Sequence, residues 1–323
     1  MPTREEFAQC EIITVSDFSK ALEICRDLRQ KDPLKPYILS FEEGLSLGNF
    51  IFPYSHFYLR AEKKHTLQGS LYAKMKDDKG EELSTWKTAT LKVTGSHNLF
   101  EGFAIENTAG DPENKGQEVA LAIYGDDNLF LHVELSSTQD TLFIGPLPDD
   151  LATRYINFIP ENERYHEGNT HNRFLFDTIK GSVDFIFGAG KASFYQCDIV
   201  SVDDGRKEAY VSAPAHSLKD DFGFLFASCH FINGAVEKHS IYLARPWRDY
   251  GKSVFVSCTY DDHIKSEGFA EWNNEQRYRT ARFEEYPLQK GRVSWTKNQK
   301  SAPLPERYDE EIRLLEALAL RLK

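Results

Sequence analysis

The chain has 323 residues, of which 41% are hydrophobic and 28% charged, and a formal net charge of −11 at pH 7. This hydrophobic content suffices for a large core, and the negative charge disfavours nucleic acids and anionic membranes as partners. Residues 1–15 contain no basic stretch followed by an apolar run, so no signal peptide or membrane span is predicted. We expect a cytoplasmic protein, or a secreted one if a leader has been removed.

The first predicted element is a helix over about residues 15–31. Ser16 is a suitable N-cap residue for it. Apolar side chains follow at helical spacing, namely Phe18, Leu22, Cys25 and Leu28. The segments that follow are strand-like, so we interpret this helix as a cap on the open end of a β structure.

A serine-esterase pattern, G-x-S-x-G, occurs at Gly44–Gly48. That motif works on a sharp turn with a strand before it and a helix after it. The segment NFIFPY that follows is typical of a strand and not of a helix. We therefore predict an ordinary turn between β segments here, with the serine esterase as the less favoured alternative.

The middle of the chain contains a degenerate repeat. An apolar first residue is followed by further core positions at +3 and +5, with strand-like alternation and turn residues between the copies. The first residues of the six copies are Phe100, Phe130, Phe174, Phe194, Phe226 and Phe255. Such a repeat predicts an all-β solenoid, best interpreted as a parallel β-helix whose stacked strands lie about 4.8 Å apart. The whole chain, 1–323, is then a single domain with rungs over about residues 36–295.

Three of the five cysteines occupy the middle position of this repeat. They are Cys197, Cys229 and Cys258. Small buried thiols stacked on one another explain this pattern better than disulfides or metal ligands do. We predict a row of reduced, buried side chains.

Two aspartates occupy equal positions in consecutive copies of the repeat. Asp140 and Asp184 each follow the first residue of their copy, Phe130 or Phe174, at the same distance. Stacking therefore predicts that the two carboxyl groups are neighbours, so one pKa should rise. One protonated carboxyl beside one carboxylate suits acid and nucleophile roles. Glycoside hydrolysis also uses a carboxyl pair, so the pair alone leaves the reaction open.

Four short segments around these aspartates resemble one known family. They are GQEVAL at 116–121, STQDTLF at 137–143, GSVDFIFG at 181–188 and YLARPW at 242–247. In this order they are similar to the QAVAL, QDTLY, GxVDFIFG and LGRPW patterns of the pectin methylesterase family, and the resemblance covers roughly residues 15–295. It implies a right-handed parallel β-helix and a cofactor-free carbohydrate esterase that hydrolyses galacturonate methyl esters.

The same resemblance implies a role for each matching catalytic residue. Asp184 matches the nucleophile, and Asp140 matches the general acid that protonates departing methanol and then activates water. Gln117 and Gln139 match the amide donors for the oxyanion. Arg245 matches the arginine that holds the nucleophile in place and keeps it ionised.

Substrate contacts are expected from three aromatic residues. Trp247 matches an aromatic that packs against the sugar, while Trp272 and Phe185 are further candidates. Burial against the barrel is the alternative for both tryptophans. The chain departs from the family pattern beside the chemistry, with Glu118 after Gln117 for example, so we expect activity with altered binding.

The excursion over residues 144–172 separates the two aspartates in sequence and is longer than in plant-type members. We expect it to form a loop beside the cleft that limits substrate length. Its segment HEGNTH, His166–His171, lacks the spacing of a helical metal-binding pair and is predicted to be a solvated loop. No metal site is predicted.

A second helix is predicted at about residues 305–322. Its acidic start and basic end suit the helix dipole. An apolar stripe formed by Ile312, Leu315 and Leu318 predicts packing on the side of the barrel, with a dimer contact as the alternative. We expect a monomer.

The predicted partners are methylesterified homogalacturonan or oligogalacturonides. Methylated stretches are neutral, so the acidic protein would not repel them. The alternative is a non-catalytic β-helix that binds uronic-acid polymers. The joint presence of Asp140, Asp184, Gln117, Gln139 and Arg245 argues against that alternative, because binding alone does not need all five.

Overall fold

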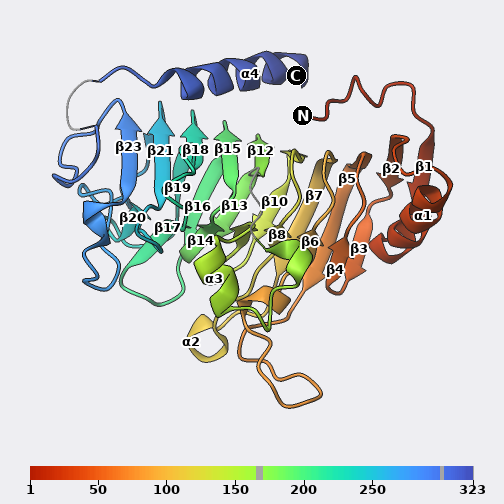
Figure 1. The fold of residues 1–323 in the computed structure, drawn as a ribbon, viewed down its shortest axis with the longest axis horizontal. Coiled ribbons are helices and arrows are strands. Elements are labelled where there is room, and N and C mark those ends of the chain that lie inside the picture. Colours follow the sequence, from red (N-terminus) through yellow and green to blue (C-terminus); the bar gives the residue numbers. More distant parts are fainter. Residues whose placement is uncertain (165–169, 299–301, 323) are drawn as a thin grey trace.

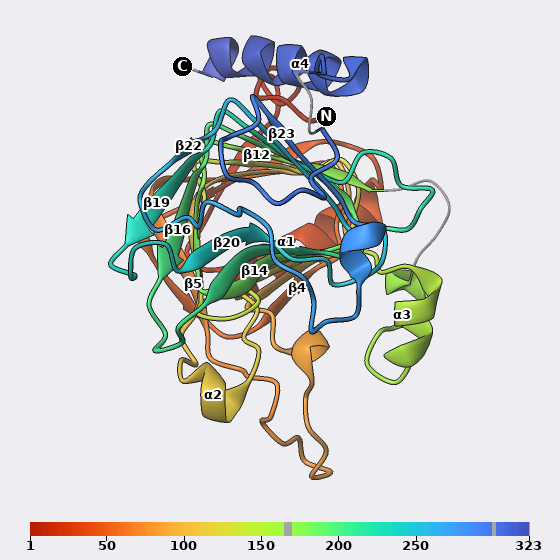
Figure 2. The same ribbon diagram turned by 90° about the vertical axis from the view of Figure 1, so that its left-hand side faces the viewer.

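The computed structural model describes residues 1–164, 170–298 and 302–322. Parallel strands coil into stacked rungs, with one helix near each end (Figure 1). Figure 2 shows the coil from its end, with three faces around an interior that buried side chains fill. The predicted parallel β-helix is confirmed.

One face is a seven-stranded parallel sheet, which we call the short sheet. Its strands, in spatial order, are β20 (Ile241–Ala244), β17 (Ala209–Pro214), β14 (Val183–Gly188), β11 (Leu142–Ile144), β8 (Leu121–Ile123), β6 (Leu91–Val93) and β4 (Phe50–Phe52).

The other two faces belong to one sixteen-stranded sheet that folds around the coil. The first of these faces contains β9 (Leu129–Leu131), β12 (His171–Leu175), β15 (Lys191–Tyr195), β18 (Phe224–Ala227), β21 (Lys252–Val256) and β23 (Arg282–Tyr286). The second contains β10 (Glu134–Ser136), β13 (Thr178–Gly181), β16 (Asp198–Val202), β19 (His230–Gly234) and β22 (Thr259–Tyr260). The strands β1 (Ile12–Val15), β2 (Tyr37–Phe41), β3 (Gly44–Leu47), β5 (Phe57–Gly69) and β7 (Leu99–Asn107) complete it at the N-terminal end.

The corner between these two faces is made by residues in the left-handed backbone region. In β7 the corner residue is Gly102, with φ +78°. A Cβ atom there would lie 2.3 Å from the carbonyl oxygen of Ala61, so only glycine fits. Later rungs place other residues at the same position with φ between +51° and +58°, namely His132, Phe176, Gln196, Ser228 and Ser257.

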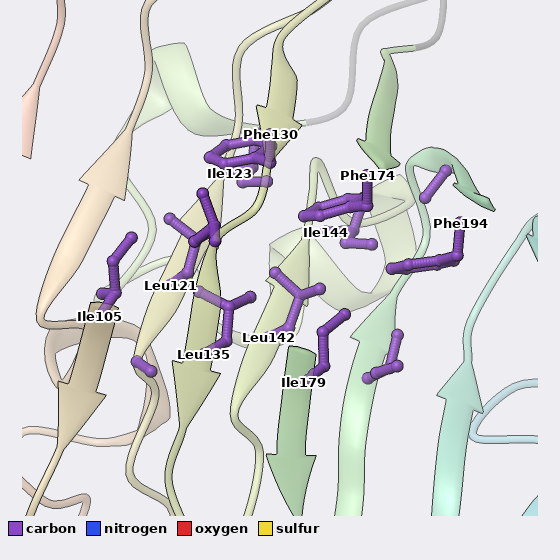
Figure 3. Packing of buried hydrophobic residues seen from close by; sticks show 14 of the residues in the cluster. Ile105, Leu121, Ile123, Phe130, Leu135, Leu142, Ile144, Phe174, Ile179 and Phe194 are labelled. Carbon is purple, nitrogen blue, oxygen red and sulfur yellow. The ribbon is translucent and has the colours of Figure 1, made fainter. Parts of the chain in front are cut away.

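The interior follows the predicted repeat. The six phenylalanines that begin the repeat copies pair in register and stack with ring centroids 4.7–5.1 Å apart and interplanar angles of 7–15°. Beside them lie aliphatic columns such as Ile105, Leu135 and Ile179 (Figure 3). Each fully buried side chain of this kind contributes roughly 1.5–3 kcal/mol, so the columns are the main source of stability.

Polar columns also run along the coil. Asn98, Asn128 and Asn172 form a ladder of side-chain hydrogen bonds. Nδ2 of Asn98 donates to Oδ1 of Asn128 at 3.0 Å, and Nδ2 of Asn128 donates to Oδ1 of Asn172 at 3.1 Å. The predicted row of free thiols is confirmed at Cys197, Cys229 and Cys258, although Cys258 is only partly buried. Each thiol donates to a phenylalanine carbonyl of the preceding rung at 3.4 Å.

The N-terminal helix α1 (Phe18–Lys31) covers the open end of the coil, where Phe18, Ala21 and Cys25 are buried. Its N-cap is Asp17, whose side chain accepts from the Lys20 amide at 2.9 Å. The prediction that Ser16 caps the helix is therefore wrong by one residue. The Ser16 hydroxyl instead donates to the Asp17 carboxylate, since a carboxylate is the stronger acceptor for the helix amide.

The C-terminal helix α4 (Glu306–Leu322) lies across the outer side of the face that contains β12 and β23 (Figures 1 and 2). Its side chains Tyr308, Leu315 and Leu318 pack on outward-facing residues of that sheet. A buried ion pair between Arg173 and Glu311, at 2.8 Å, fixes its position. The predicted packing on the side of the barrel is confirmed.

Two short helices, α2 (Pro112–Lys115) and α3 (Asp149–Arg154), lie in excursions next to the short sheet. Three single 3-10 turns occupy Thr85–Lys87, Glu161–Glu163 and Arg277–Arg279. Within the described ranges, none of the helices has the length and apolar character needed to cross a bilayer.

Candidate active site

Asp140 and Asp184 lie on the short sheet, one rung apart. The pairing of Leu142 with Ile186 puts the two aspartates at equal positions, and the Asp140 amide donates to the Val183 carbonyl at 3.1 Å. Neighbouring strands are about 4.8 Å apart, so the side chains are adjacent. This confirms that the repeat makes the two aspartates neighbours.

Both aspartates have unusual backbone conformations. Their φ angles are +65° for Asp140 and +52° for Asp184, and the register of β14 shifts between Val183 and Ile186. Aspartate tolerates the left-handed region better than most residues, although such strain still costs about 1 kcal/mol or more. The shift lies in the pairing of β14 with β17 and spans Asp184, and a bulge of this kind re-aims the side chains within it.

Arg245 holds Asp184 with both arms of its guanidinium. Nε donates to Oδ1 at 2.8 Å and Nη2 donates to Oδ2 at 2.6 Å. The arginine directly follows β20, and the rings of Tyr210 and Trp272 lie 3.8 and 4.3 Å from its Cζ atom. Burial would lower the pKa of Arg245, but the charge of Asp184 outweighs it and raises the pKa. The result is a rigid, mostly buried ion pair.

Asp140 has a different electrostatic environment. Burial raises its pKa well above the ordinary value, and the negative charge of Asp184 raises it further. The cations Arg245 and Arg206 and a hydrogen bond from Gln139 oppose this rise only in part. The pair therefore combines one carboxyl whose protonated form is favoured by its surroundings with a second carboxyl that an arginine holds.

The two predicted amide donors both line the cavity at the aspartates. The Oε1 atom of Gln139 accepts from Nη1 of Arg206 at 2.9 Å. This leaves the amide nitrogen of Gln139 as the end available to the cavity. Glu118, where the chain differs from the family pattern beside Gln117, is fully buried and does not line the cavity. Its carboxylate accepts from the Gly110 amide at 2.6 Å.

The cavity has a volume of about 160 Å³. Six of the predicted residues line it, and a seventh, Arg245, contacts the lining residue Asp184 directly. The lining consists of Thr85, Trp86, Gln117, Gln139, Asp140, Tyr155, Asp184, Phe187, Ala213, Trp247 and Trp272. The lining combines carboxyl and amide side chains with several aromatic rings, as in a site for a sugar.

Sequence reasoning missed several wall residues. Trp86 lies on a 3-10 turn and stacks on Trp247, with ring centroids 6.4 Å apart and an angle of 22°. Tyr155 follows α3 and lies 5.0 Å from the Trp86 ring. Neither residue belongs to a repeat copy or a family motif. A tryptophan within a polar excursion is the one signal that could have indicated Trp86.

The predicted loop over residues 144–172 does lie beside the cleft, since it contributes Tyr155 to the wall. Residues 166–169 of the HEGNTH segment are outside the described residues. His171 starts strand β12 and its Nε2 atom is 2.8 Å from the Ser193 hydroxyl. The interpretation of His171 as part of a solvated loop is therefore corrected.

Phe185 does not reach the cavity. Its side chain is completely buried among interior residues of the coil, and Phe187 lines the cavity instead. Residues in a strand alternate between two sides, and the neighbour of the outward-facing Asp184 therefore points inward. The expectation that Phe185 contacts substrate is corrected.

The serine motif is a structural feature. Gly44–Leu47 forms strand β3, without the strand–turn–helix geometry that the esterase motif needs. The Ser46 hydroxyl lies 2.9 Å from Nε2 of His65 and accepts from the Phe18 amide. Ser46 is 4% exposed and His65 fully buried, so no substrate reaches this pair.

Comparison with known proteins gives one consistent family. The family model described as Pectinesterase matches residues 64–146 and 168–303. Pectinesterase QRT1 of Arabidopsis thaliana is 33% identical over 229 residues, which cover 68% of this chain and 52% of that protein. The chain thus spans about half of the length of this relative.

Solved structures with the same fold include the pectin methylesterase from Aspergillus niger, with a TM-score of 0.70, 19% identity and 92% coverage of both chains. A pectin methylesterase in complex with a hexasaccharide has a TM-score of 0.64 and 20% identity, with coverage of 87% of this chain and 94% of that one. At these identities the similarity demonstrates the fold.

Proposed function

This chain belongs to the pectinesterase family, and from that premise we propose that it hydrolyses the methyl esters of galacturonate units in pectin or methylated oligogalacturonides. The products are methanol and a free galacturonate carboxylate. The observation that carries the proposal is the carboxyl pair, in which Arg245 holds Asp184 and burial raises the pKa of Asp140. The hexasaccharide complex of a structural neighbour supports an oligosaccharide substrate.

In the first half of the proposed reaction, an Asp184 oxygen attacks the ester carbonyl carbon. The negative charge that develops on the carbonyl oxygen is stabilised by the amide groups of Gln117 and Gln139. Asp140 then transfers its proton to the departing methoxide, which leaves as methanol. The galacturonyl group remains on Asp184 as an anhydride.

In the second half, Asp140 is a carboxylate and takes a proton from water. The resulting hydroxide attacks the acyl carbon, and Asp184 leaves as a carboxylate. Asp140 is again protonated, so both residues return to their starting states. The raised pKa of Asp140 suits a group that must first give a proton and then accept one.

Methanol release tests this mechanism directly. We expect Asp184→Asn to reduce methanol release from methylated oligogalacturonides by about three orders of magnitude or more, because the nucleophile is lost. Asp177→Asn is the matched control, since Asp177 is also buried with a raised pKa but does not line the cavity. Full activity in Asp184→Asn would exclude the mechanism. A wild-type chain that binds these oligosaccharides without methanol release would identify a binding protein instead.

A further inference from the structure

Three side chains far from the cavity lining meet on the outside of the coil. Glu6, His56 and His97 each have a ligand atom within 4.8 Å of the other two. They come from three separate segments: Glu6 precedes β1, His56 directly precedes β5, and His97 comes shortly before β7. None of the three lines the candidate active site.

The β-helix itself holds the two histidines together. The pairing of Tyr58 with Leu99 puts His56 and His97 at equal positions in successive rungs. Both have left-handed backbone, with φ of +61° and +57°, so both turns direct the side chain in the same way. The ring centroids are 5.0 Å apart. The spacing of the rungs therefore fixes the distance between the imidazoles.

The next rung orients one of these rings. Nδ1 of His97 is 2.9 Å from Oδ2 of Asp127, and the other carboxylate oxygen of Asp127 accepts from Arg173 at 3.2 Å. A carboxylate accepts and cannot donate, so Nδ1 of His97 carries the proton in this contact. A metal-binding histidine is commonly oriented by a carboxylate in the same manner.

This arrangement leaves two acceptors face to face. With its proton on Nδ1, the neutral ring of His97 has a lone pair on Nε2, and this atom lies 2.9 and 3.0 Å from the two oxygens of Glu6. A lone pair and a carboxylate repel each other unless a cation lies between them. That cation is either a second proton on His97 or a metal ion that also binds His56.

We propose that Glu6, His56 and His97 form a binding site for a transition-metal dication such as Zn²⁺, with Asp127 orienting His97. Two imidazoles and one carboxylate suit Zn²⁺, Ni²⁺ or Cu²⁺, whereas Mg²⁺ and Ca²⁺ prefer sets of oxygen ligands. Glu6 is exposed and both histidines are half-buried, so ions and a completing water molecule can reach the site. Arg29 is a cationic neighbour, but its guanidinium donates to the carbonyls of Ser55 and His56.

Bound metal would tie the segment before β1 to the first rungs of the coil. Glu6 is contributed by that segment, while His56 and His97 belong to two consecutive rungs. A ligand that binds only the folded arrangement stabilises it by mass action. The site therefore couples metal binding to the stability of the N-terminal end of the β-helix.

Calorimetric titration of the metal-stripped chain with Zn²⁺ and Mg²⁺ tests the site. We expect saturable 1:1 binding of Zn²⁺ that is at least about tenfold tighter than that of Mg²⁺, together with a higher Tm in the presence of Zn²⁺. Glu6→Gln, His56→Asn and His97→Asn should each weaken Zn²⁺ binding by about tenfold or more. Asparagine is chosen at the two turns because it tolerates the left-handed backbone.

His230→Asn is the matched control, since Nε2 of His230 lies 3.1 Å from Asp261 in a comparable exposed pair on a distant rung. It should leave Zn²⁺ binding unchanged. Absence of saturable Zn²⁺ binding, or equal binding in the wild type and in Glu6→Gln, would overturn the proposal and assign the cation to a proton on His97.

Discussion

Asp140 and Asp184 have the same side chain but opposite partners, and these partners distinguish their proposed roles. Nε and Nη2 of Arg245 both donate to Asp184, and the rings of Tyr210 and Trp272 contact the guanidinium. Asp140 is buried beside this ion pair and its pKa rises, first because of burial and then because of the charge of Asp184. The proposed nucleophile and the proposed acid are therefore one residue type in two different local environments.

Asp140→Asn should remove activity but increase stability at high pH. The pKa of Asp140 is higher in the folded than in the unfolded chain, so its contribution to stability is complete below the unfolded value and is lost as pH rises through the folded value. Above that range the wild type buries a charge that asparagine lacks. We expect the variant to unfold at higher denaturant concentration at pH 8, by about 1 kcal/mol, and to release almost no methanol.

A denaturation series between pH 4 and pH 9 measures this difference. The difference in the free energy of unfolding between the wild type and Asp140→Asn should widen toward high pH. A gap that is constant over this range, or a variant that is less stable at pH 8, would contradict the raised pKa of Asp140.

At the scale of elements, two excursions that lie outside the repeat complete the cavity. The 3-10 turn Thr85–Lys87 brings Trp86, and the segment after α3 brings Tyr155, so that the two rings lie 5.0 Å apart over the cavity. Strand β14 of the short sheet supplies Asp184 and Phe187, and the two excursions add Trp86 and Tyr155 to the aromatic wall.

Tyr155→Ala should affect binding more than turnover. Tyr155 lines the wall but is not assigned to any proton or acyl transfer, so we expect KM for methylated oligogalacturonides to rise about tenfold and kcat to change by less than about twofold. Ile156→Ala is a suitable control, because Ile156 is the next residue and is 48% exposed. Steady-state methanol release over a series of chain lengths measures both constants. A fall in kcat at constant KM would be inconsistent with this role.

Helix α4 shows how an element outside the coil is held. Its apolar stripe covers outward-facing side chains such as Leu175 and Leu225, and the Arg173–Glu311 ion pair joins it to β12. The stripe was predictable from the spacing of Ile312, Leu315 and Leu318. The face of the coil that it covers was not, because three faces were available to it.

At the scale of the whole molecule, the coil is held together by contacts between adjacent rungs. Phe130 and Phe174 stack at 4.9 Å, and the same contact recurs down to Phe255. In such a structure each rung interacts with its neighbours and not with distant rungs. Substitutions in adjacent rungs should therefore be coupled in their effect on stability, and substitutions in distant rungs should not.

Double-mutant cycles on this column test the range of coupling. Phe130→Leu and Phe174→Leu should show a coupling energy of about 0.5–1.5 kcal/mol, because the substitutions remove one shared stacking contact. Phe130→Leu and Phe226→Leu lie several rungs apart and should add within about 0.5 kcal/mol. Urea denaturation of the four-variant sets gives both values. Equal coupling in the two cycles would show that the coil does not behave as a stack of neighbours.

The amino-acid sequence by itself determined the repetitive part of this protein. Parallel stacking converts equal positions in the repeat into spatial neighbours, and this rule placed the phenylalanine column, the cysteine row and the Asp140–Asp184 pair correctly. The rule needs no knowledge of the loops between the copies. It does not determine which residues beside Asp184 face the cavity: Phe185 points inward in alternation with Asp184, and Phe187 lines the cavity instead.

Only the tertiary structure decided where the non-repetitive segments lie. Trp86 and Tyr155 reach the cavity from excursions whose paths depend on packing contacts with distant parts of the chain, and Arg206 reaches the cavity residue Gln139 in the same way. The meeting of Glu6 with His56 and His97 has the same origin, because the segment before β1 lies outside the repeat. A repeat specifies the neighbours of its own copies, whereas a loop or terminal segment finds its neighbours through contacts that no period in the sequence encodes.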